Sequence, residues 1–370
     1  MEQVILTAEN GYTELDRYIR SVGADSLFLV CGASIRSMPV GAYFDTLPDR
    51  LQIRVTRFSD FCPNPSCESA AEGIRAFRAS GSKMIAAVGG GSAIDVAKCI
   101  RIWNETEVLD SFWKQAAAPN NIPFLAVPTT AGSGSEATRF AVLYHQGEKL
   151  SITHPDCRPS AVLLDSSTLR SLPLYHKKAA MLDALCHGIE SCWSVNSTAE
   201  SREYSREGIR LLMANYRRYL RYGEGKEMLW ASHLAGRAIH ITQTTAGHAM
   251  CYQLTSRYKI AHGHAAALCV EALWPHMLEH MGDCVDLRGQ NHLEGILQEI
   301  AQAMGCTEAG EAPRRFHDLL AEIGMEMPDI AEEELDVLTS SVAPERLKNH
   351  PVRLDREAIY ELYRQIFHVV

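Results

Sequence analysis

The pattern of apolar residues changes near residue 165, and this change constrains the fold more than any other feature of the chain. Before it, short apolar runs alternate with longer stretches of helical periodicity, and several of the runs end at glycine or proline. Such alternation is typical of a parallel β-sheet covered by helices. The predicted strands are 26–30, 52–57, 84–88 and 123–127, with 140–144 and 161–164 as further candidates, and the clearest helices between them are 66–80 and 92–103.

After residue 165, strand-like runs nearly vanish, and glycine and proline become sparse. Helical periodicity predicts helices over 175–195, 199–222, 226–245, 263–281, 291–304, 312–323 and 355–367. The sequence therefore predicts two domains, an α/β domain over residues 1–165 and an all-helical domain over residues 166–370. We expect a ligand site in the cleft between two such domains.

Composition excludes several classes of function. The 370 residues carry a formal net charge of −9, whereas a general nucleic-acid-binding protein needs a basic face. No apolar run reaches the roughly 20 residues that span a bilayer, so we expect no membrane partner. The first residues lack the basic and apolar regions of a secretory signal, and the eleven cysteines form no C-x-x-C pair. These observations predict a cytoplasmic protein with reduced cysteines.

Two polar loops follow predicted strands. Three glycines and Ser92 follow strand 84–88, where N–H groups at the start of a helix can hold a pyrophosphate, and Ser92 is the expected helix cap. A plain strand-to-helix turn has the same pattern, so this motif alone leaves nucleotide binding open. Residues 128–138 contain five hydroxyls and two glycines directly after strand 123–127. Open α/β sheets bind ligands at this edge, so the second loop favours a binding function.

Four residues of the predicted helical domain have the chemistry of a metal site. Asp183 and His187 are four residues apart in one predicted helix and share a face, and His248 and His262 follow later in the chain. One carboxylate and three imidazoles suit a divalent transition metal and leave a position open for substrate. Each residue alone is more often an ordinary polar side chain. The metal site therefore depends on the convergence of all four in space.

Together, these motifs resemble those of group III, iron-containing alcohol dehydrogenases, in the same order along the chain. Pro63-Asn64-Pro65 is similar to a further element of that family, and Arg346 with Asn349-His350-Pro351 is similar to its C-terminal segment, where His350 replaces an asparagine. The resemblance implies a dehydroquinate synthase-like fold, with a nicotinamide cofactor on the α/β domain and a metal on the helical domain. It also implies an oxidoreductase that transfers hydride between that cofactor and an aldehyde or alcohol, and a homodimer.

The resemblance also implies roles for individual residues. The metal ligands would be Asp183, His187, His248 and His262. Iron(II) is the metal of the family, and Zn2+ accepts the same donors, so the sequence leaves both open. The cofactor contacts would be glycines, hydroxyls and other polar side chains of the first domain: Asn64, Gly90, Gly91, Ser92, Asp95, Thr129, Thr130, Ser133, Thr138 and Lys149.

Two positions bear on proton transfer and on the choice of cofactor. Tyr252 stands where the family has a second histidine, so we expect a proton relay to use Tyr252, water or cofactor hydroxyls. Gly32 stands where NAD-using relatives tend to carry an acid, and Ser34 and Arg36 follow it. A carboxylate there would accept a hydrogen bond from the ribose 2′-OH and repel a 2′-phosphate. Its absence therefore favours NADPH, with NADH as the alternative.

Several segments are similar to one branch of the family, the phosphonoacetaldehyde reductases: 190–198, 244–250, 254–256 and 262–264. This resemblance implies reduction of phosphonoacetaldehyde to 2-hydroxyethylphosphonate. A dianionic substrate needs cations or donors near the metal, and His264 is the first choice because it lies two residues from His262. Tyr252 and His264 are therefore the predicted catalytic residues. The other candidates for the anion are Arg139, Arg257 and Lys259.

Three other functions stay open. The enzyme could act on a neutral aldehyde, alcohol or diol, which relative rates with charged and neutral aldehydes would reveal. A lyase of dehydroquinate synthase type also uses a nicotinamide and a metal, but it returns the cofactor to its starting state and consumes no NADPH. A non-catalytic dimerising or metal-storage module would bind a metal without binding a nicotinamide.

Overall fold

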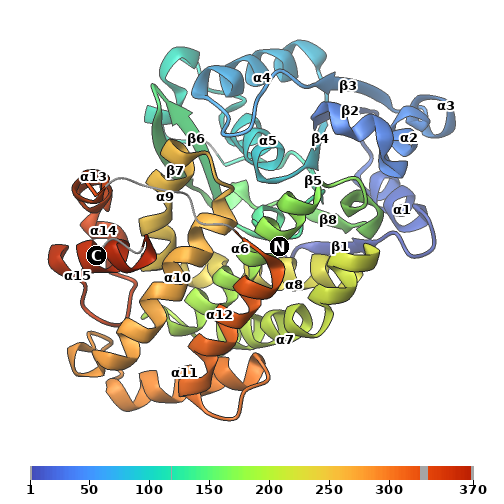
Figure 1. Cartoon of the computed structure of the whole chain (residues 1–370). Helices are drawn as coiled ribbons and strands as arrows, with labels where there is room; N and C mark the ends of the chain where they lie inside the picture. The colour runs from blue at the N-terminus through green and yellow to red at the C-terminus, as the bar shows by residue number, and fades with distance from the viewer. Residues whose placement is uncertain (1, 118, 326–331, 368–370) are drawn as a thin grey trace. The chain divides into compact units, whose positions relative to one another are not determined.

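The computed structural model describes residues 2–117, 119–325 and 332–367, which form two compact units (Figure 1). Unit 1 comprises Met1–Leu172 with Gly223–Leu229, and unit 2 comprises Pro173–Tyr222 with Trp230–Val370. Unit 1 is an α/β domain, and the regular elements described in unit 2 are helices, which confirms the predicted fold class. Residues 166–172 and 223–229 lie in the predicted helical domain but belong to unit 1.

Unit 1 is built on a six-stranded sheet in the order β1-β8-β5-β4-β2-β3, and every neighbouring pair is parallel. The order along the chain reverses at β2 and β4, since β3 lies on one side of this pair and β5, β8 and β1 lie on the other. The carboxyl ends of β2 and β4 are therefore the topological switch point, where open α/β sheets bind ligands. The strands are β1 (Val4–Thr7), β2 (Ser26–Cys31), β3 (Arg54–Phe58), β4 (Met84–Gly89), β5 (Phe124–Pro128) and β8 (Ala161–Leu164).

Both faces of the sheet are buried, because successive side chains of a strand point to opposite faces. In β2, Phe28 and Val30 belong to the apolar cluster on one face, while Leu27 and Leu29 belong to the cluster on the other. This double burial explains why the central strands are continuous apolar runs in the sequence. The helices of unit 1 are α1 (Thr13–Val22), α2 (Pro39–Asp45), α3 (Leu47–Leu51), α4 (Cys67–Ser80) and α5 (Gly91–Trp103).

Four elements of unit 1 differ from the prediction. The predicted strand 140–144 is β6 (Phe140–His145), but it forms an antiparallel hairpin with β7 (Glu148–Thr153) outside the large sheet. The sequence did not predict β1 or β7, because both are short strands with exposed positions. The prediction that Ser92 caps α5 is wrong: Gly90 is the N-cap, and Ser92 lies in the first turn.

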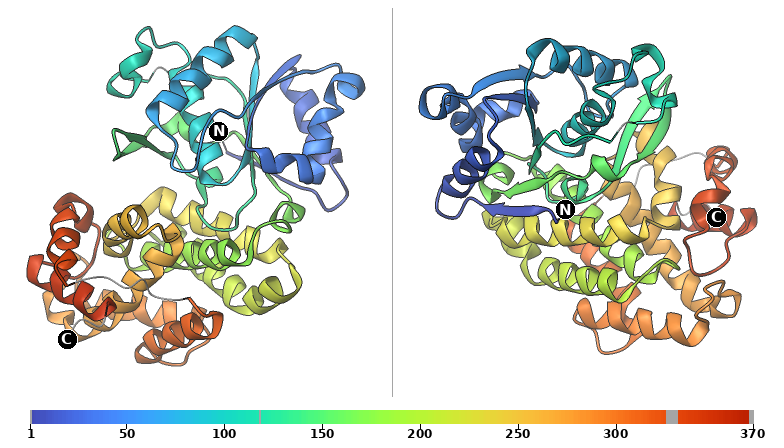
Figure 2. Two further views of the ribbon diagram at one scale, coloured as in Figure 1. Left: turned by 45° about the horizontal axis from the view of Figure 1, so that its top comes forward. Right: turned by 180° about the vertical axis from the view of Figure 1, so that it is seen from behind.

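Unit 2 packs α6 against α7 and α10, and α10 against α9; Figure 2 shows these helices from two further sides. The sequence did not predict α9, α13 or α14. The helices described in unit 2 are α6 (Leu174–Trp193), α7 (Ala199–Tyr222), α8 (Lys226–Thr242, which begins in unit 1), α9 (Ala246–Tyr258), α10 (His262–Glu279), α11 (Gln290–Ala303), α12 (Ala312–Ile323), α13 (Glu334–Ser341), α14 (Pro344–Leu347) and α15 (Arg356–Ile366).

Two general expectations can be compared with the structure. All eleven cysteines are free thiols. In the part of the chain that the structure describes, no helix combines the length and the apolar character needed to cross a membrane.

Candidate active site

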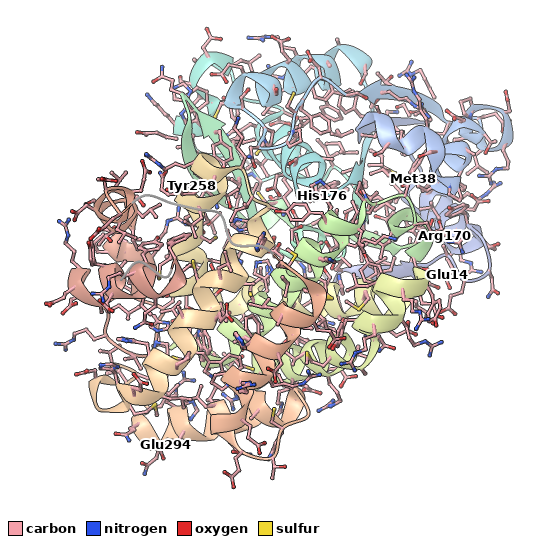
Figure 3. All side chains as sticks on the ribbon, viewed as in Figure 1. Glu14, Met38, Arg170, His176, Tyr258 and Glu294 are labelled. Carbon is pink, nitrogen blue, oxygen red and sulfur yellow. The ribbon has the colours of Figure 1, made fainter. Side chains whose placement is uncertain are left out.

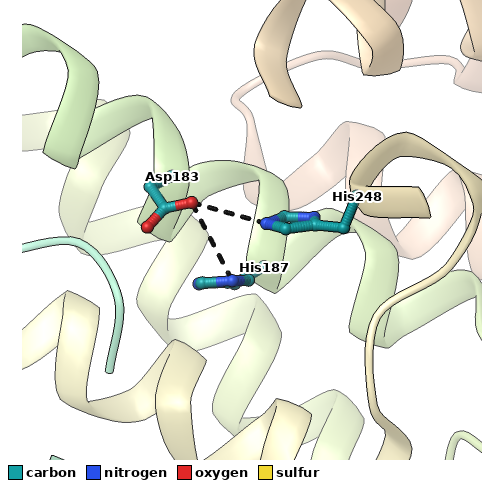
Figure 4. A group of neighbouring side chains, drawn as sticks. All are labelled: Asp183, His187 and His248. Carbon is teal, nitrogen blue, oxygen red and sulfur yellow. Dashed lines mark hydrogen bonds and ion pairs between the residues drawn. The ribbon is translucent and has the colours of Figure 1, made fainter. Parts of the chain in front are cut away.

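Three of the four predicted metal ligands come together in unit 2 (Figure 4). Asp183 and His187 lie one turn apart on α6, and His248 lies in the first turn of α9. Asp183 Oδ1 is 3.4 Å from Nε2 of His248 and 3.9 Å from Nε2 of His187, and the two imidazole rings stack with centroids 4.5 Å apart. All three residues are buried, and one candidate ligand atom from each lies within 4.8 Å of the others.

The fourth predicted ligand, His262, lies beside this group as the first residue of α10. Its ring centroid is 5.3 Å from that of His248. The position of His262 depends on the next residue, Gly263. A Cβ atom on Gly263 would lie 2.5 Å from Cβ of Asp183 and 2.0 Å from the carbonyl oxygen of Ala179, so only glycine lets α10 begin this close to α6.

Glu190 contacts Nδ1 of His248, the ring nitrogen that does not face Asp183. The sequence did not predict Glu190 as a site residue. This fully buried carboxylate forms an ion pair with Nδ1 of His248. Its Oε1 accepts hydrogen bonds from the Thr245 N–H at 3.0 Å, the Thr245 hydroxyl at 2.7 Å and the His248 N–H at 3.3 Å. Glu190 on α6 therefore also satisfies N–H groups at the start of α9. Its sequence signal is the i, i+4, i+7 spacing of Asp183, His187 and Glu190.

The buried charges of the site stabilise one another. Burial opposes the charge of Asp183, but the imidazoles of His187, His248 and His262 outweigh it and hold the pKa of Asp183 well below its usual range. Burial also opposes the charge of Glu190, while His248 lowers its pKa to about 2. Burial disfavours a charged His248, but the two carboxylates outweigh it and raise its pKa to about 9. The two buried carboxylates thus give this site a preference for positive charge.

The donor set fits a divalent transition metal. A neutral His248 donates from Nδ1 to Glu190 and keeps a lone pair on Nε2, the ring atom nearest Asp183. A carboxylate behind a ligand imidazole fixes the ring and raises its basicity, which is typical of metal centres. A carboxylate together with imidazoles suits both Fe2+ and Zn2+.

The two predicted catalytic residues lie near His262 in the chain, and their surroundings differ. The Tyr252 ring is nearly parallel to that of His262, with centroids 5.8 Å apart, and its hydroxyl accepts a hydrogen bond from Arg346. His264 is buried, with Nδ1 3.3 Å from the Tyr175 hydroxyl, and its Nε2 has no hydrogen-bond partner within the described ranges. Burial lowers the pKa of His264, which favours the neutral form of this imidazole.

The three other candidates for binding an anionic substrate differ in their exposure and in their partners. Arg257 forms an ion pair of 2.7 Å with Glu334, and Lys259 is exposed just after α9, whose last residue, Tyr258, is labelled in Figure 3. Arg139 belongs to unit 1, where its guanidinium lies 5.5 Å from the centre of the Phe140 ring. Of the two candidates in unit 2, Arg257 is therefore partly neutralised and Lys259 is open to solvent.

The two polar loops of unit 1 lie side by side at the ends of neighbouring strands. β4 pairs with β5, and the Thr129 N–H donates to the carbonyl of Gly89 at 3.0 Å. A Cβ atom on Gly90 would lie 3.3 Å from Thr130 Cγ2, and the Gly91 position is similarly close to Ser133. The glycines therefore let the two loops approach each other at the carboxyl edge of the sheet.

A fully buried lysine ties the second loop to α5. Lys98 Nζ donates to the hydroxyls of Ser135 at 2.8 Å and Thr138 at 3.1 Å. Asp95, one turn earlier on α5, accepts from the Ser135 hydroxyl at 2.6 Å and from the Val142 N–H at 3.0 Å. Two of the predicted cofactor residues, Asp95 and Thr138, thus take part in the internal network that holds the loop in place.

The remaining predicted cofactor residues lie in three separate segments of unit 1. Gly32 follows β2 at the switch point, and Ser34 and Arg36 are exposed in the short helix after it. A Cβ atom on Gly32 would meet no other atom within 4 Å, so a side chain fits there. Asn64 precedes α4 and has a φ of 57°, and Lys149 lies in β7.

Comparison with known proteins decides the family. A family model described as iron-containing alcohol dehydrogenase matches residues 3–166, and the C-terminal model of the Fe-containing alcohol dehydrogenase family matches residues 177–367. The chain is also similar to phosphonoacetaldehyde reductase from Streptomyces viridochromogenes, with 34% identity over 317 residues that cover 80% of this chain and 79% of that protein. The chain belongs to the iron-containing alcohol dehydrogenase family. It is therefore an oxidoreductase, which confirms the resemblance seen in its motifs.

Two further proteins are similar to this chain at lower identity. The 1,3-propanediol dehydrogenase of Citrobacter freundii is 27% identical over 382 residues, covering 97% of this chain and 95% of that protein. Among solved structures, sulfoacetaldehyde reductase from Bifidobacterium kashiwanohense in complex with NAD+ has a TM-score of 0.88 at 24% identity, covering 100% of this chain and 98% of that one. At this identity, the structural likeness establishes the shared fold.

Proposed function

We propose that this enzyme reduces phosphonoacetaldehyde to 2-hydroxyethylphosphonate with NADPH at a divalent metal centre. The observation that carries the proposal is the buried group of Asp183, His187 and His248, backed by Glu190, in a chain 34% identical to a phosphonoacetaldehyde reductase. The charged carboxyl of Asp183 and the imidazoles provide donors for a cation, and the similarity supports the substrate.

In this proposal, Asp183, His187, His248 and His262 hold the metal, with Fe2+ as the family metal and Zn2+ as the alternative. A metal held by these residues would supply Lewis-acid polarisation of a carbonyl oxygen, and a nicotinamide would supply the hydride. Glu190 keeps Nε2 of His248 directed to the Asp183 side and balances the positive charge of the centre.

Protein groups must also deliver a proton to the alcohol oxygen. Tyr252 stands at the position of the family's second histidine, and its phenol can hold a proton at Oη, where Arg346 already donates a hydrogen bond. Nε2 of His264 has no partner in the described residues, and burial favours its neutral form, so it can donate a hydrogen bond to a substrate oxygen. We therefore assign Tyr252 to proton transfer and His264 to substrate binding.

The cofactor is proposed to bind at the switch point of unit 1. The N–H groups at the start of α5, next to Gly90 and Gly91, suit the pyrophosphate. The turn after β2 offers Gly32 instead of an acid, and the exposed Arg36 follows it, which favours the 2′-phosphate of NADPH over NADH.

The test is NADPH oxidation by metal-loaded enzyme with four aldehydes: phosphonoacetaldehyde, sulfoacetaldehyde, propanal and 3-hydroxypropanal. The proposal expects kcat/KM for phosphonoacetaldehyde to exceed that for propanal by about tenfold or more, because a cation or donor that binds the anion contributes at least roughly 1.4 kcal/mol. Phosphorus NMR of the product checks the reduction. A preference for propanal would remove the phosphonate assignment.

A second candidate function is oxidation or reduction of a neutral alcohol, aldehyde or diol. It is favoured by the similarity to 1,3-propanediol dehydrogenase, which extends over 97% of the chain. The pairing of Arg257 with Glu334 also leaves one candidate cation partly neutralised. A higher kcat/KM with 3-hydroxypropanal than with both anionic aldehydes would establish this alternative.

We also propose that the enzyme is a homodimer located in the cytoplasm. The dimer follows from the family resemblance, and the location follows from the eleven free cysteines. Light scattering of the purified protein and fractionation of cells that express it would test both.

A further inference from the structure

His262 differs from the other proposed ligands because it begins a helix and is partly exposed. Two neighbouring side chains of α9 contact its ring. Cys251 Sγ lies 3.6 Å from Nδ1 of His262, and the ring of Tyr252 is parallel to the imidazole within 9°, with centroids 5.8 Å apart. This separation is within the range of offset-stacked rings.

Tyr252 is itself held by a residue far away in the sequence. Arg346, in α14, donates a hydrogen bond of 3.0 Å to the Tyr252 hydroxyl. Its guanidinium carbon also lies 4.7 Å from the centre of the Tyr252 ring, within the distance for a cation–π contact. One guanidinium therefore contacts the ring and the hydroxyl of the same tyrosine, which restricts the rotation of the Tyr252 side chain.

We propose that Arg346 is a positioning residue which, through Tyr252, sets the orientation of His262 and hence the metal affinity of the site. This inference rests on the proposed function, in which His262 is a metal ligand. It also gives a physical use to the tyrosine that replaces the family's histidine. A phenol offers both a larger stacking face and a hydroxyl that Arg346 can bond.

The experiment measures Co2+ and Zn2+ affinity by competition with a chelator, together with the visible absorption of the Co2+ protein. Removing partners that orient a ligand typically weakens metal binding about tenfold or more, so Arg346→Met and Tyr252→Leu should each weaken Co2+ binding by about tenfold and alter its visible bands. Tyr252→Phe keeps the ring and loses the hydroxyl, so its loss should be smaller than that of Tyr252→Leu. The double variant should bind no more weakly than Tyr252→Leu alone, because both changes act through one ring.

Two control variants make the result decisive. Arg356→Met removes an exposed arginine of unit 2, paired with Asp336 at 2.9 Å, and should keep wild-type affinity. His262→Ala tests the ligand itself. Loss of affinity in His262→Ala with wild-type affinity in Arg346→Met would overturn the positioning role and leave the proposed function standing. Wild-type affinity in His262→Ala would overturn the ligand set and this inference with it. If Arg346→Met does not fold, the same comparison is made with Tyr252→Phe and Tyr252→Leu.

Discussion

Glu190 and His248 form a buried ion pair between α6 and α9, with side-chain exposures of 0% and 3%. The same carboxylate accepts hydrogen bonds from N–H groups at the start of α9, so it fixes both the imidazole and the helix that carries it. Gly247 makes this approach feasible, since a Cβ atom there would lie 3.1 Å from Oε1 of Glu190. The carboxylate and the proposed ligand thus form one structural unit.

Glu190→Gln should weaken metal binding while preserving the shape of the site. The amide still accepts hydrogen bonds from α9 but carries no charge to balance His248 and the cation. Metal affinity should fall about 10- to 100-fold, as measured by chelator competition. Glu294→Gln, an exposed glutamate of α11, serves as the control. Equal affinities in the two variants would show that the Glu190 charge is not needed.

Gly263→Ala should separate α10 from α6. The added methyl group would meet the backbone of α6 at 2.0 Å, a clash that no side-chain movement relieves. We expect a destabilisation of about 1–3 kcal/mol or more and loss of most metal binding, measured by urea unfolding and chelator competition. Gly295→Ala in α11 is the matched control, because a Cβ there meets nothing within 4 Å and should stabilise the helix by roughly 0.5–1 kcal/mol. Metal affinity equal to wild type in Gly263→Ala would contradict the close approach.

Gly32→Asp should shift the cofactor preference towards NADH. The aspartate fits without a clash, accepts a hydrogen bond from a ribose 2′-OH and repels a 2′-phosphate. The ratio of kcat/KM for NADPH to that for NADH should fall about tenfold or more, which corresponds to roughly 1.4 kcal/mol. Ser37→Asp adds the same charge at an exposed position at the end of the same short helix and should leave the ratio nearly unchanged. An unchanged ratio in Gly32→Asp would place the 2′-phosphate elsewhere.

His350 should make the stability of the protein sensitive to acid. It is 1% exposed, and neither ring nitrogen has a hydrogen-bond partner among the described residues. Burial lowers its pKa to about 4, with His276 adding to this effect and Glu190 opposing it. Between pH 6.5 and pH 4, the unfolded chain binds a proton that the folded chain does not, so stability falls as the pH falls through this window.

The variant His350→Asn places the family's residue at this position and removes the titrating group. The wild type should lose roughly 3 kcal/mol more stability than the variant across the window, because one pKa unit corresponds to about 1.4 kcal/mol. Urea unfolding of both proteins near pH 7 and pH 4.5 measures the difference. Parallel losses in the two proteins would refute the assignment.

The sequence predicted those parts of the site that follow from local periodicity. Asp183 and His187 were placed on one face by their spacing of four, and the parallel strands were visible as continuous apolar runs. Glu190 carries the same signal, at i+7 from Asp183, but a helical glutamate is usually a surface residue. Only the structure shows that this face of α6 turns inward at Glu190.

Contacts between distant segments could not be predicted from spacing. The start of α9 has no side-chain cap of its own, because Glu190 of α6 satisfies its N–H groups, so the usual sequence signal for a helix start is missing. Arg346 and Tyr252 are 94 positions apart, and no periodicity relates them. Such contacts depend on tertiary packing, which the pattern of one segment does not encode.

The two glycine turns at the switch point differ in the space that they leave for an added side chain. Open space surrounds the Cβ position of Gly32, whereas the positions of Gly90 and Gly91 are crowded by Thr130 and Ser133 at 3.2–3.4 Å. Mutations can therefore accumulate in the first turn without disturbing the second. Under the proposed cofactor assignment, a single substitution at Gly32 would exchange one nicotinamide for the other, while the second turn stays under tight steric constraint.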